Sequence, residues 1–208
     1  MPDNKENGLA GNLSHAKSPR QNVIYIGPLS RFHSLRGVET IYDLMITISG
    51  PEPHRTFFEN KILMQLKFFL KKVLLVRGLP SENNNFLQST NSLKIVNHLS
   101  AQEMNMAFLQ SKMIIGRSGY TTVMDLSVLG KKAILIPTPG QPEQEYLAKY
   151  LFERKYFYCI DEDNFSIEET LKKADLFEFK IIDISFEEYK KTIKEFVLSL
   201  KSGNFASQ

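Results

Sequence analysis

The chain has 208 residues, of which 42% are hydrophobic and 24% are charged. These proportions are ordinary for a soluble globular protein, and the length suits one domain or one domain with a tail. The formal net charge of +3 is too small, and the basic residues are too dispersed, to suggest a nucleic-acid-binding protein.

The sequence also lacks the features of disulfide-bonded, metal-binding, membrane-spanning and secreted proteins. The single cysteine, Cys159, cannot form an internal disulfide, which is consistent with a reducing compartment. The four histidines lie far apart without metal-ligand spacing, so we expect neither a metal nor another cofactor. No apolar run approaches the roughly 18 residues of a membrane span, and no signal peptide is recognisable. We therefore expect a cytoplasmic protein.

Residues 1–21 differ in composition from the remainder of the chain. They are rich in Asn, Lys, Ser, Gly and Pro and have almost no periodic apolar pattern. Such a composition is typical of a linker. We interpret residues 1–21 as the remnant of an interdomain linker and residues 22–208 as one folded domain.

Short apolar runs alternate with helical patterns from residue 22 onward. The runs are apolar nearly throughout, as expected of strands that are covered on both faces. The predicted strands are residues 23–26, 44–49, 73–76, 93–96, 113–116, 133–136 and 157–160. This alternation predicts the α/β class, with a Rossmann-like parallel sheet and helices on both faces.

Several predicted helices have recognisable starts or buried faces. Capping boxes, in which a serine is followed three residues later by glutamate, occur at residues 100–103, 166–169 and 185–188. Helical spacing relates the apolar residues Phe58, Ile62, Leu66, Phe69 and Leu70. The lysine-flanked aromatic segment 67–72 could contact a membrane. We favour packing in the core for these apolar side chains.

In an open α/β sheet, ligands bind beyond the carboxyl ends of the strands. The loops expected there are residues 49–51, 77–78, 97–99, 116–119 and 137–140. The fourth loop has the sequence Gly116-Arg117-Ser118-Gly119 and precedes an apolar helix. Glycine allows close backbone approach, and a helix start offers unpaired N–H donors, so this loop suits a diphosphate. A helix-capping Ser118 and a solvated Arg117 fit the local pattern equally well.

Two further positions carry polar groups suited to a nucleotide sugar. Asp125 lies in the apolar helix and could accept hydrogen bonds from ribose hydroxyls, although a solvated or backbone-paired acid is the simpler interpretation. Gln144 suits sugar hydroxyls because its side-chain amide both donates and accepts hydrogen bonds. Glu143 could instead simply complement the dipole of the helix that it opens. The loop 116–119 fits neither the P-loop nor the G-x-G-x-x-G pattern.

Residues 114–151 resemble the donor-binding signature of GT-B glycosyltransferases. The stretch is similar to glycosyltransferase family 28, which includes the bacterial enzyme that adds N-acetylglucosamine in making lipid II. The family pattern is [S/G]-R-S-G after a strand, an acid in the next helix, G-[KL]-P-x-[IL]-x-[IV]-P, and a Gln-rich helix start. The corresponding positions here are Gly116-Arg117-Ser118-Gly119, Asp125, residues 130–137 and Glu143-Gln144.

The resemblance implies a role for each matching position. Ser118 and Gly119, with Gly50, would face the diphosphate, and Gln144 would contact the sugar. Asp125 would hold the ribose, although the family usually has glutamate there. The backbone near His98 and Leu99 would contact a uracil-like base. The complete set of predicted donor-binding residues is Gly50, His98, Leu99, Arg117, Ser118, Gly119, Tyr120, Asp125, Glu143 and Gln144.

The implied function is donor binding within an inverting, metal-independent glycosyltransferase that uses a UDP-sugar. The general base would belong to an acceptor-binding domain or subunit, so we expect this chain alone to be inactive. Peripheral membrane contact would occur through the full enzyme. The alternatives are an epimerase-like domain, the donor-binding subunit of a two-subunit transferase, and a non-catalytic nucleotide-sugar-binding module.

Residues 161–163, with the sequence Asp-Glu-Asp, imitate the D-x-D motif of metal-dependent transferases. They follow the better-supported loops and precede a predicted helix. We interpret them as a solvated acidic loop rather than as a metal site.

Overall fold

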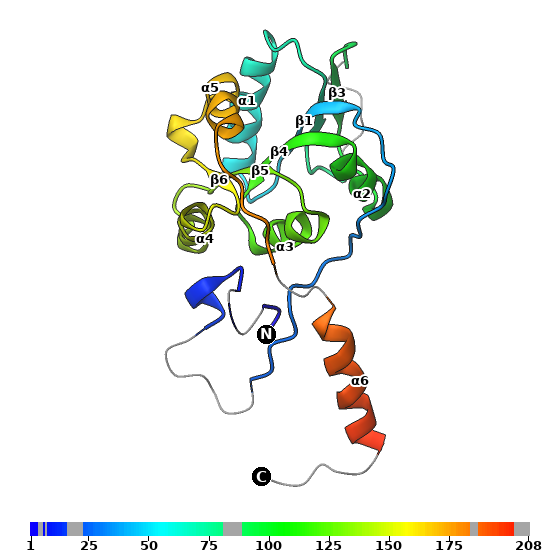
Figure 1. Ribbon diagram of the computed structural model, residues 1–208. Coiled ribbons are helices and arrows are strands. Elements are labelled where there is room, and N and C mark those ends of the chain that lie inside the picture. Colours follow the sequence, from blue (N-terminus) through cyan, green and yellow to red (C-terminus); the bar gives the residue numbers. More distant parts are fainter. Residues whose placement is uncertain (4–5, 7, 16–22, 81–88, 184–186, 202–208) are drawn as a thin grey trace. The chain divides into compact units, whose positions relative to one another are not determined.

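The computed structural model describes residues 1–3, 6, 8–15, 23–80, 89–183 and 187–201. The chain forms two compact units (Figure 1). One unit comprises Ser30–Ile182, and the other combines Met1–Leu29 with Asp183–Gln208. Each unit is described separately below.

The larger unit is built on a six-stranded, wholly parallel sheet with the order β3-β2-β1-β4-β5-β6. The strands are β1 (Tyr42–Thr47), β2 (Val73–Val76), β3 (Leu93–Val96), β4 (Ser111–Arg117), β5 (Ala133–Ile136) and β6 (Tyr158–Cys159). Successive strands first extend the sheet on one side of β1 and then, from β4 onward, on the other. The order therefore reverses between β1 and β4, which is where open α/β sheets form a ligand crevice.

Helices cover both faces of this sheet (Figure 1). They are α1 (His54–Leu66), α2 (Ala101–Leu109), α3 (Tyr120–Leu129), α4 (Pro142–Glu153) and α5 (Ile167–Asp175). Helices α1 and α5 lie on one face, and α2, α3 and α4 lie on the other. The predicted fold class, a Rossmann-like α/β domain, is confirmed.

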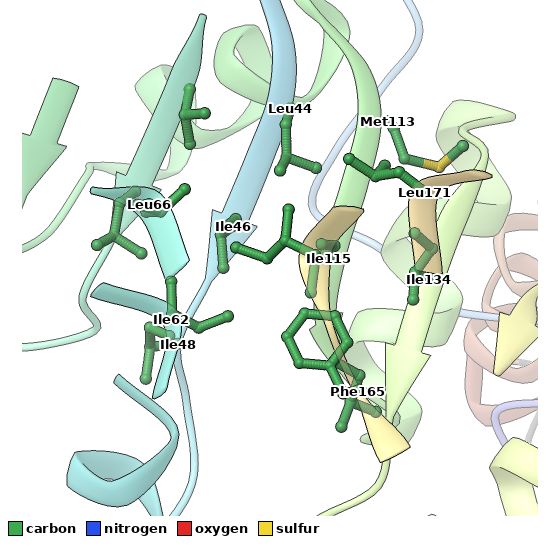
Figure 2. Packing of buried hydrophobic residues seen from close by; sticks show 14 of the residues in the cluster. Leu44, Ile46, Ile48, Ile62, Leu66, Met113, Ile115, Ile134, Phe165 and Leu171 are labelled. Carbon is green, nitrogen blue, oxygen red and sulfur yellow. The ribbon is translucent and has the colours of Figure 1, made fainter. Parts of the chain in front are cut away.

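The hydrophobic core on the α1 and α5 face follows the alternation of side chains along each strand (Figure 2). Leu44 and Ile46 of β1 and Ile115 of β4 are fully buried there. Phe58 of α1 and Phe165, just before α5, pack against one another with ring centroids 6.0 Å apart. Strands β2 and β5 are buried at every residue, which agrees with their continuously apolar sequences.

Most predicted strands are present, with some shifts of boundary. Residues 73–76, 93–96 and 133–136 form strands with the predicted bounds. The strand predicted at 44–49 begins and ends two residues earlier, the one at 113–116 is longer, and the one at 157–160 is shorter. The strand predicted at residues 23–26 is wrong. Its backbone pairs instead with the amino terminus, through Ile26 N–H donating to the Met1 carbonyl and Gly27 N–H to that of Asp3.

The predicted helix starts have different outcomes. At α2, Ser100 and Glu103 form both hydrogen bonds of the predicted capping box. At α5 the box is wrong, because Ser166 makes no side-chain cap. The first amide of that helix, at Ile167, instead donates to Gln65 Oε1 of α1 at 2.6 Å. The third box falls partly outside the described residues, which resume just before α6 (Glu188–Lys201).

The core prediction for the segment after α1 is wrong in part. Phe58, Ile62 and Leu66 are buried as predicted. Phe68 and Leu70 are 86% and 92% exposed, because the helix ends at Leu66 and the helical spacing is lost. No helix within the described residues is long and apolar enough to cross a membrane.

The smaller unit includes a compact turn near the amino terminus. The Asp3 carboxylate is fully buried and accepts hydrogen bonds from the amides of Leu9 and Ala10 and from Ser14 Oγ. A short 3-10 helix, η1 (Gly11–Leu13), follows. The proposed boundary between a linker and a domain at residues 21 and 22 stays a prediction.

Candidate functional site

The loops that follow β1, β4 and β5 converge at the carboxyl edge of the sheet, next to the reversal of strand order. Gly50 follows β1, Gly119 follows β4 and Thr138 follows β5. Gly50 and Thr138 approach each other, since a Cβ placed on Gly50 would lie 3.8 Å from Thr138 Oγ1. Because β4 lies between β1 and β5, this approach takes place near the loop that leads from β4 into α3.

The amino terminus of α3 has no side-chain cap. Its N-cap residue is Gly119, whereas α2 begins with the capping serine described above. The first N–H groups of an α-helix have no carbonyl partner within the helix, and they form the positive end of its dipole. A Cβ placed on Gly119 would meet no atom within 4 Å. The helix start therefore has room for a ligand, and the binding of an anion there stays a prediction.

A hydrogen-bond network fixes the loop between β5 and α4. The side-chain oxygen of Gln144 accepts from the Thr138 amide at 3.0 Å, and Glu145 Oε1 accepts from the Gly140 amide at 2.9 Å. Ser118 is fully buried, and its hydroxyl donates to the Gln144 carbonyl at 2.9 Å. Ser118 therefore joins the start of α3 to α4 and does not cap α3, which corrects the interpretation of Ser118 as a capping residue.

Arg117 is buried inside the domain, with only 2% of its surface exposed. Its Nη1 lies 2.6 Å from Glu162 Oε2 and donates to the Pro137 carbonyl at 3.1 Å. The guanidinium also lies 4.0 Å from the centre of the Phe58 ring. The interpretation of Arg117 as a solvated residue is thus wrong. Its predicted contact with the donor would require it to leave Glu162.

The acidic segment 161–163 is not wholly solvated. The carboxylate of Glu162, in the 3-10 helix η2 (Glu162–Asn164), is directed inward to Arg117, and its side chain is 14% exposed. The prediction of a solvated loop is therefore wrong for Glu162, because a buried cation needs a nearby anion. Asp161 and Asp163 are exposed.

A hollow of about 230 Å³ lies beside this segment, at the ends of β5 and β6. Four of its lining residues are acidic: Glu145, Asp161, Glu162 and Asp163. Carboxylates repel phosphates, so this hollow does not suit a diphosphate. The helix start at Gly119 is the better anion site of the two.

Asp125 is buried within α3 at 7% exposure. Its Oδ1 accepts a hydrogen bond of 2.6 Å from Ser30 Oγ. Burial raises the pKa of the Asp125 carboxyl, and the Ser30 hydrogen bond opposes that rise. The interpretation of Asp125 as a solvated or backbone-paired acid is therefore wrong. A ribose hydroxyl would have to share or replace Ser30.

The other predicted donor-binding residues are spread along the same edge. His98 and Leu99 follow β3 at the border of the sheet, where His98 is exposed and Leu99 is half-buried. Tyr120 begins α3 and is half-buried, and Glu143 is exposed in the first turn of α4. These positions do not gather at one point. An elongated ligand that lies across the strand ends could reach them in turn.

A buried charge network supports the loops after β2 and β3, and it was not predicted from the sequence. Glu59 of α1 binds Arg55 at 2.9 Å and also pairs with Arg77. Arg77 in turn donates to Asn97 Oδ1 at 2.9 Å. Arg55 and Glu59 lie one helical turn apart on α1, whereas Arg77 and Asn97 are distant from them in sequence, so the fold is needed to complete the network. Thr138, which lies in the predicted loop 137–140, and Glu145 were not among the predicted donor-binding residues.

Solved structures share this architecture. The chain is similar to the glycosyltransferase VinC, whose structure was solved in complex with dTDP, with a TM-score of 0.55 and 11% identity. The match covers 89% of this chain and 50% of the VinC chain. The chain is also similar to the calicheamicin glycosyltransferase CalG4, with a TM-score of 0.54 and 11% identity. This match covers 84% of this chain and 44% of the CalG4 chain. The sheet and its uncapped helix define a Rossmann-like domain of the kind that forms the carboxyl-terminal half of GT-B glycosyltransferases.

Sequence comparison identifies the family. The glycosyltransferase family 28 C-terminal domain matches residues 58–200, and the chain belongs to this family. A relative from Buchnera aphidicola subsp. Schizaphis graminum is named UDP-N-acetylglucosamine--N-acetylmuramyl-(pentapeptide) pyrophosphoryl-undecaprenol N-acetylglucosamine transferase. It is 31% identical over 162 residues, which are 74% of this chain and 44% of the relative. The chain thus spans less than half the length of that relative.

Proposed function

We propose that this chain binds a UDP-sugar as the donor half of an inverting, metal-independent glycosyltransferase. The observation that carries the proposal is the open, uncapped start of α3 at Gly119. Negative charge develops on the phosphates as a nucleoside diphosphate departs. Backbone amides and the helix dipole would stabilise that charge without a metal ion.

The choice of uridine rests on family membership. The Buchnera relative is named for a UDP-N-acetylglucosamine donor, so this nucleotide sugar is the first to test. In the proposed pose the diphosphate lies between Gly50 and Gly119, and the ribose lies near Asp125. The base reaches the backbone at His98 and Leu99.

The sugar would lie beside the start of α4. Gln144 is suited to contact its hydroxyls, because the amide has donor and acceptor capacity beyond the bonds that hold the loop. Its oxygen already accepts from Thr138, and its nitrogen donates to Gln141. We therefore expect Gln144 to act on the sugar from a fixed position.

Catalysis would need a general base from an acceptor-binding domain or subunit. Two carboxylates in this region already have hydrogen-bond partners, since Asp125 accepts from Ser30 and Glu145 accepts from the Gly140 amide. We therefore expect the chain alone to bind the donor without transferring the sugar. Its cytoplasmic location, and membrane contact through a full enzyme, stay predictions.

Calorimetric titration of the chain tests the proposal. The titrants are UDP, UDP-N-acetylglucosamine, GDP and ATP, each in EDTA and again with Mg²⁺. We expect a preference for the uridine nucleotides and the same Kd with and without the metal. Tight ATP binding without a response to UDP would contradict the proposal, as would UDP binding that requires Mg²⁺.

An Asp125→Asn variant separates the ribose contact from the diphosphate contact. If Asp125 holds the ribose, the variant should bind uridine and UDP more weakly by a similar factor. Pyrophosphate, which lacks the ribose, serves as the matched titrant and should bind as it does to the wild type. Unchanged uridine binding would remove Asp125 from the site while leaving the diphosphate assignment intact.

A further inference from the structure

The hydroxyl of Thr138 is unpaired in the domain interior. Thr138 is fully buried, and within the described part of the chain its Oγ1 has no hydrogen-bond partner. Its backbone is well satisfied, because the amide donates to Gln144 Oε1. The unpaired hydroxyl lies beside Gly50, since a Cβ placed on Gly50 would be 3.8 Å from Thr138 Oγ1.

A buried hydroxyl without a partner is unfavourable, because it has lost its bonds to water and gained none. Valine has nearly the same shape as threonine and would avoid this penalty. The hydroxyl therefore adds no stability to the folded domain. An acceptor atom delivered by a ligand would give it a partner.

The surroundings of Thr138 favour an anionic acceptor. The Gly50–Thr138 approach takes place beside the loop that enters α3, whose uncapped start carries the positive end of the helix dipole. A phosphoryl oxygen bound by the α3 amides could also accept a hydrogen bond from the Thr138 hydroxyl, which would lie on the other side of that oxygen. Hydrogen bonds to charged oxygens are about twice as strong as those between neutral groups.

We propose that Thr138 Oγ–H donates a hydrogen bond to a phosphoryl oxygen of the nucleoside diphosphate. This inference rests on the proposed function and adds a contact that the sequence motif does not contain. Gly50 is exposed and has a φ of 111°, so the backbone beside the hydroxyl carries no side chain. A small shift of this loop, or rotation of the Thr138 side chain, would open the hydroxyl to the ligand.

Calorimetry with UDP and uridine on wild type, Thr138→Val and Thr138→Ser tests the contact. We expect the valine variant to bind UDP about tenfold more weakly, because a hydrogen bond to a charged group is lost. Uridine has no phosphate and should bind both proteins alike. The serine variant keeps the hydroxyl and should restore most of the affinity for UDP.

Thermal unfolding distinguishes this contact from a structural role. The valine variant should unfold at the same temperature as the wild type or at a higher one, since no hydrogen bond within the free domain is lost. Unchanged UDP affinity in that variant, or equal weakening of UDP and uridine, would overturn the inference alone. A wild-type chain that binds no UDP would instead overturn the proposed function.

Discussion

The guanidinium of Arg117 and the carboxylate of Glu162 form an ion pair in the interior of the domain, with Nη1 and Oε2 2.6 Å apart. Arg117 ends β4, and its side chain contacts Phe58 of α1. Gly119, two residues later, is the N-cap of α3, which lies on the other face of the sheet. Arg117 thus stabilises the carboxyl edge of the sheet through contacts in the interior of the domain, whereas a Cβ on Gly119 would meet open space.

Glu162→Gln should destabilise the domain strongly. The variant leaves the buried Arg117 guanidinium without its counter-charge, and breaking a buried ion pair costs about 3 kcal/mol or more. Urea unfolding measures the loss. Asp163→Asn removes an exposed charge one residue away and should change the stability by no more than about 0.5 kcal/mol. Equal effects from the two variants would contradict a supporting role for the pair.

The fold was predictable because the buried strands carry a strong local signal. Strands β2 and β5 consist wholly of buried aliphatic residues, and their bounds match the prediction. Residues 23–26, with the sequence Val-Ile-Tyr-Ile, are also mainly apolar and form no strand, with Ile24 60% exposed. A short apolar run does not reveal whether it has a neighbouring strand to pair with, and that depends on the tertiary structure.

The geometry of the candidate site was predictable where it depends on the backbone. Gly119 was identified because a glycine before an apolar helix leaves the helix start open, and the structure has this geometry. The partners of polar side chains were not predictable. Asp125 binds Ser30, which is 95 positions away in the chain, and Ser118 binds the backbone of Gln144. Such contacts depend on how loops meet after folding.

Gly119→Asp should stabilise the domain and abolish binding of UDP. Aspartate is a favoured N-cap, and the φ of −67° and ψ of 142° at Gly119 suit it. Its carboxylate would bind the α3 amides, giving a few tenths of a kcal/mol up to about 1 kcal/mol of stability. The same carboxylate would occupy the proposed phosphate position and repel the ligand. Chemical unfolding and calorimetry measure the two effects.

Gly119→Ala is the control for this prediction. Its methyl group meets no atom within 4 Å in the free domain, so only a small loss of stability is expected from alanine at an N-cap. UDP should bind more weakly, because the methyl group projects into the space proposed for the diphosphate. An aspartate variant that still binds UDP with wild-type affinity would exclude this helix start as the phosphate site.

Ser30→Ala should reduce stability in a pH-dependent way. At neutral pH the variant leaves a buried Asp125 carboxylate without the Ser30 hydrogen bond, a loss of about 1–3 kcal/mol. Because burial raises the pKa of Asp125, the native protein keeps this proton at pH values where the unfolded chain has lost it. Asp125 therefore contributes less to stability as the pH rises through that window.

Because the Ser30 hydrogen bond lowers the pKa of Asp125, its removal should raise that pKa further. The difference in stability between variant and wild type should therefore shrink as the pH falls and Asp125 becomes protonated. Urea unfolding at several pH values measures the difference. In an Asp125→Asn background there is no titration at this position, and Ser30→Ala should have an effect that does not vary with pH. A pH-dependent effect in that background would assign the titration to another group.

Gly78→Ala should destabilise the domain more than Gly140→Ala. Both glycines have left-handed backbones, with φ of 72° and 76°, so alanine at either costs about 1–2 kcal/mol of conformational strain. At Gly78 the new Cβ would also lie 2.4 Å from the Ile48 carbonyl oxygen, whereas at Gly140 it meets no atom within 4 Å. The clash should add about 1–3 kcal/mol. Urea unfolding should therefore separate the two variants, and equal losses would mean that the loop after β2 moves freely away from β1.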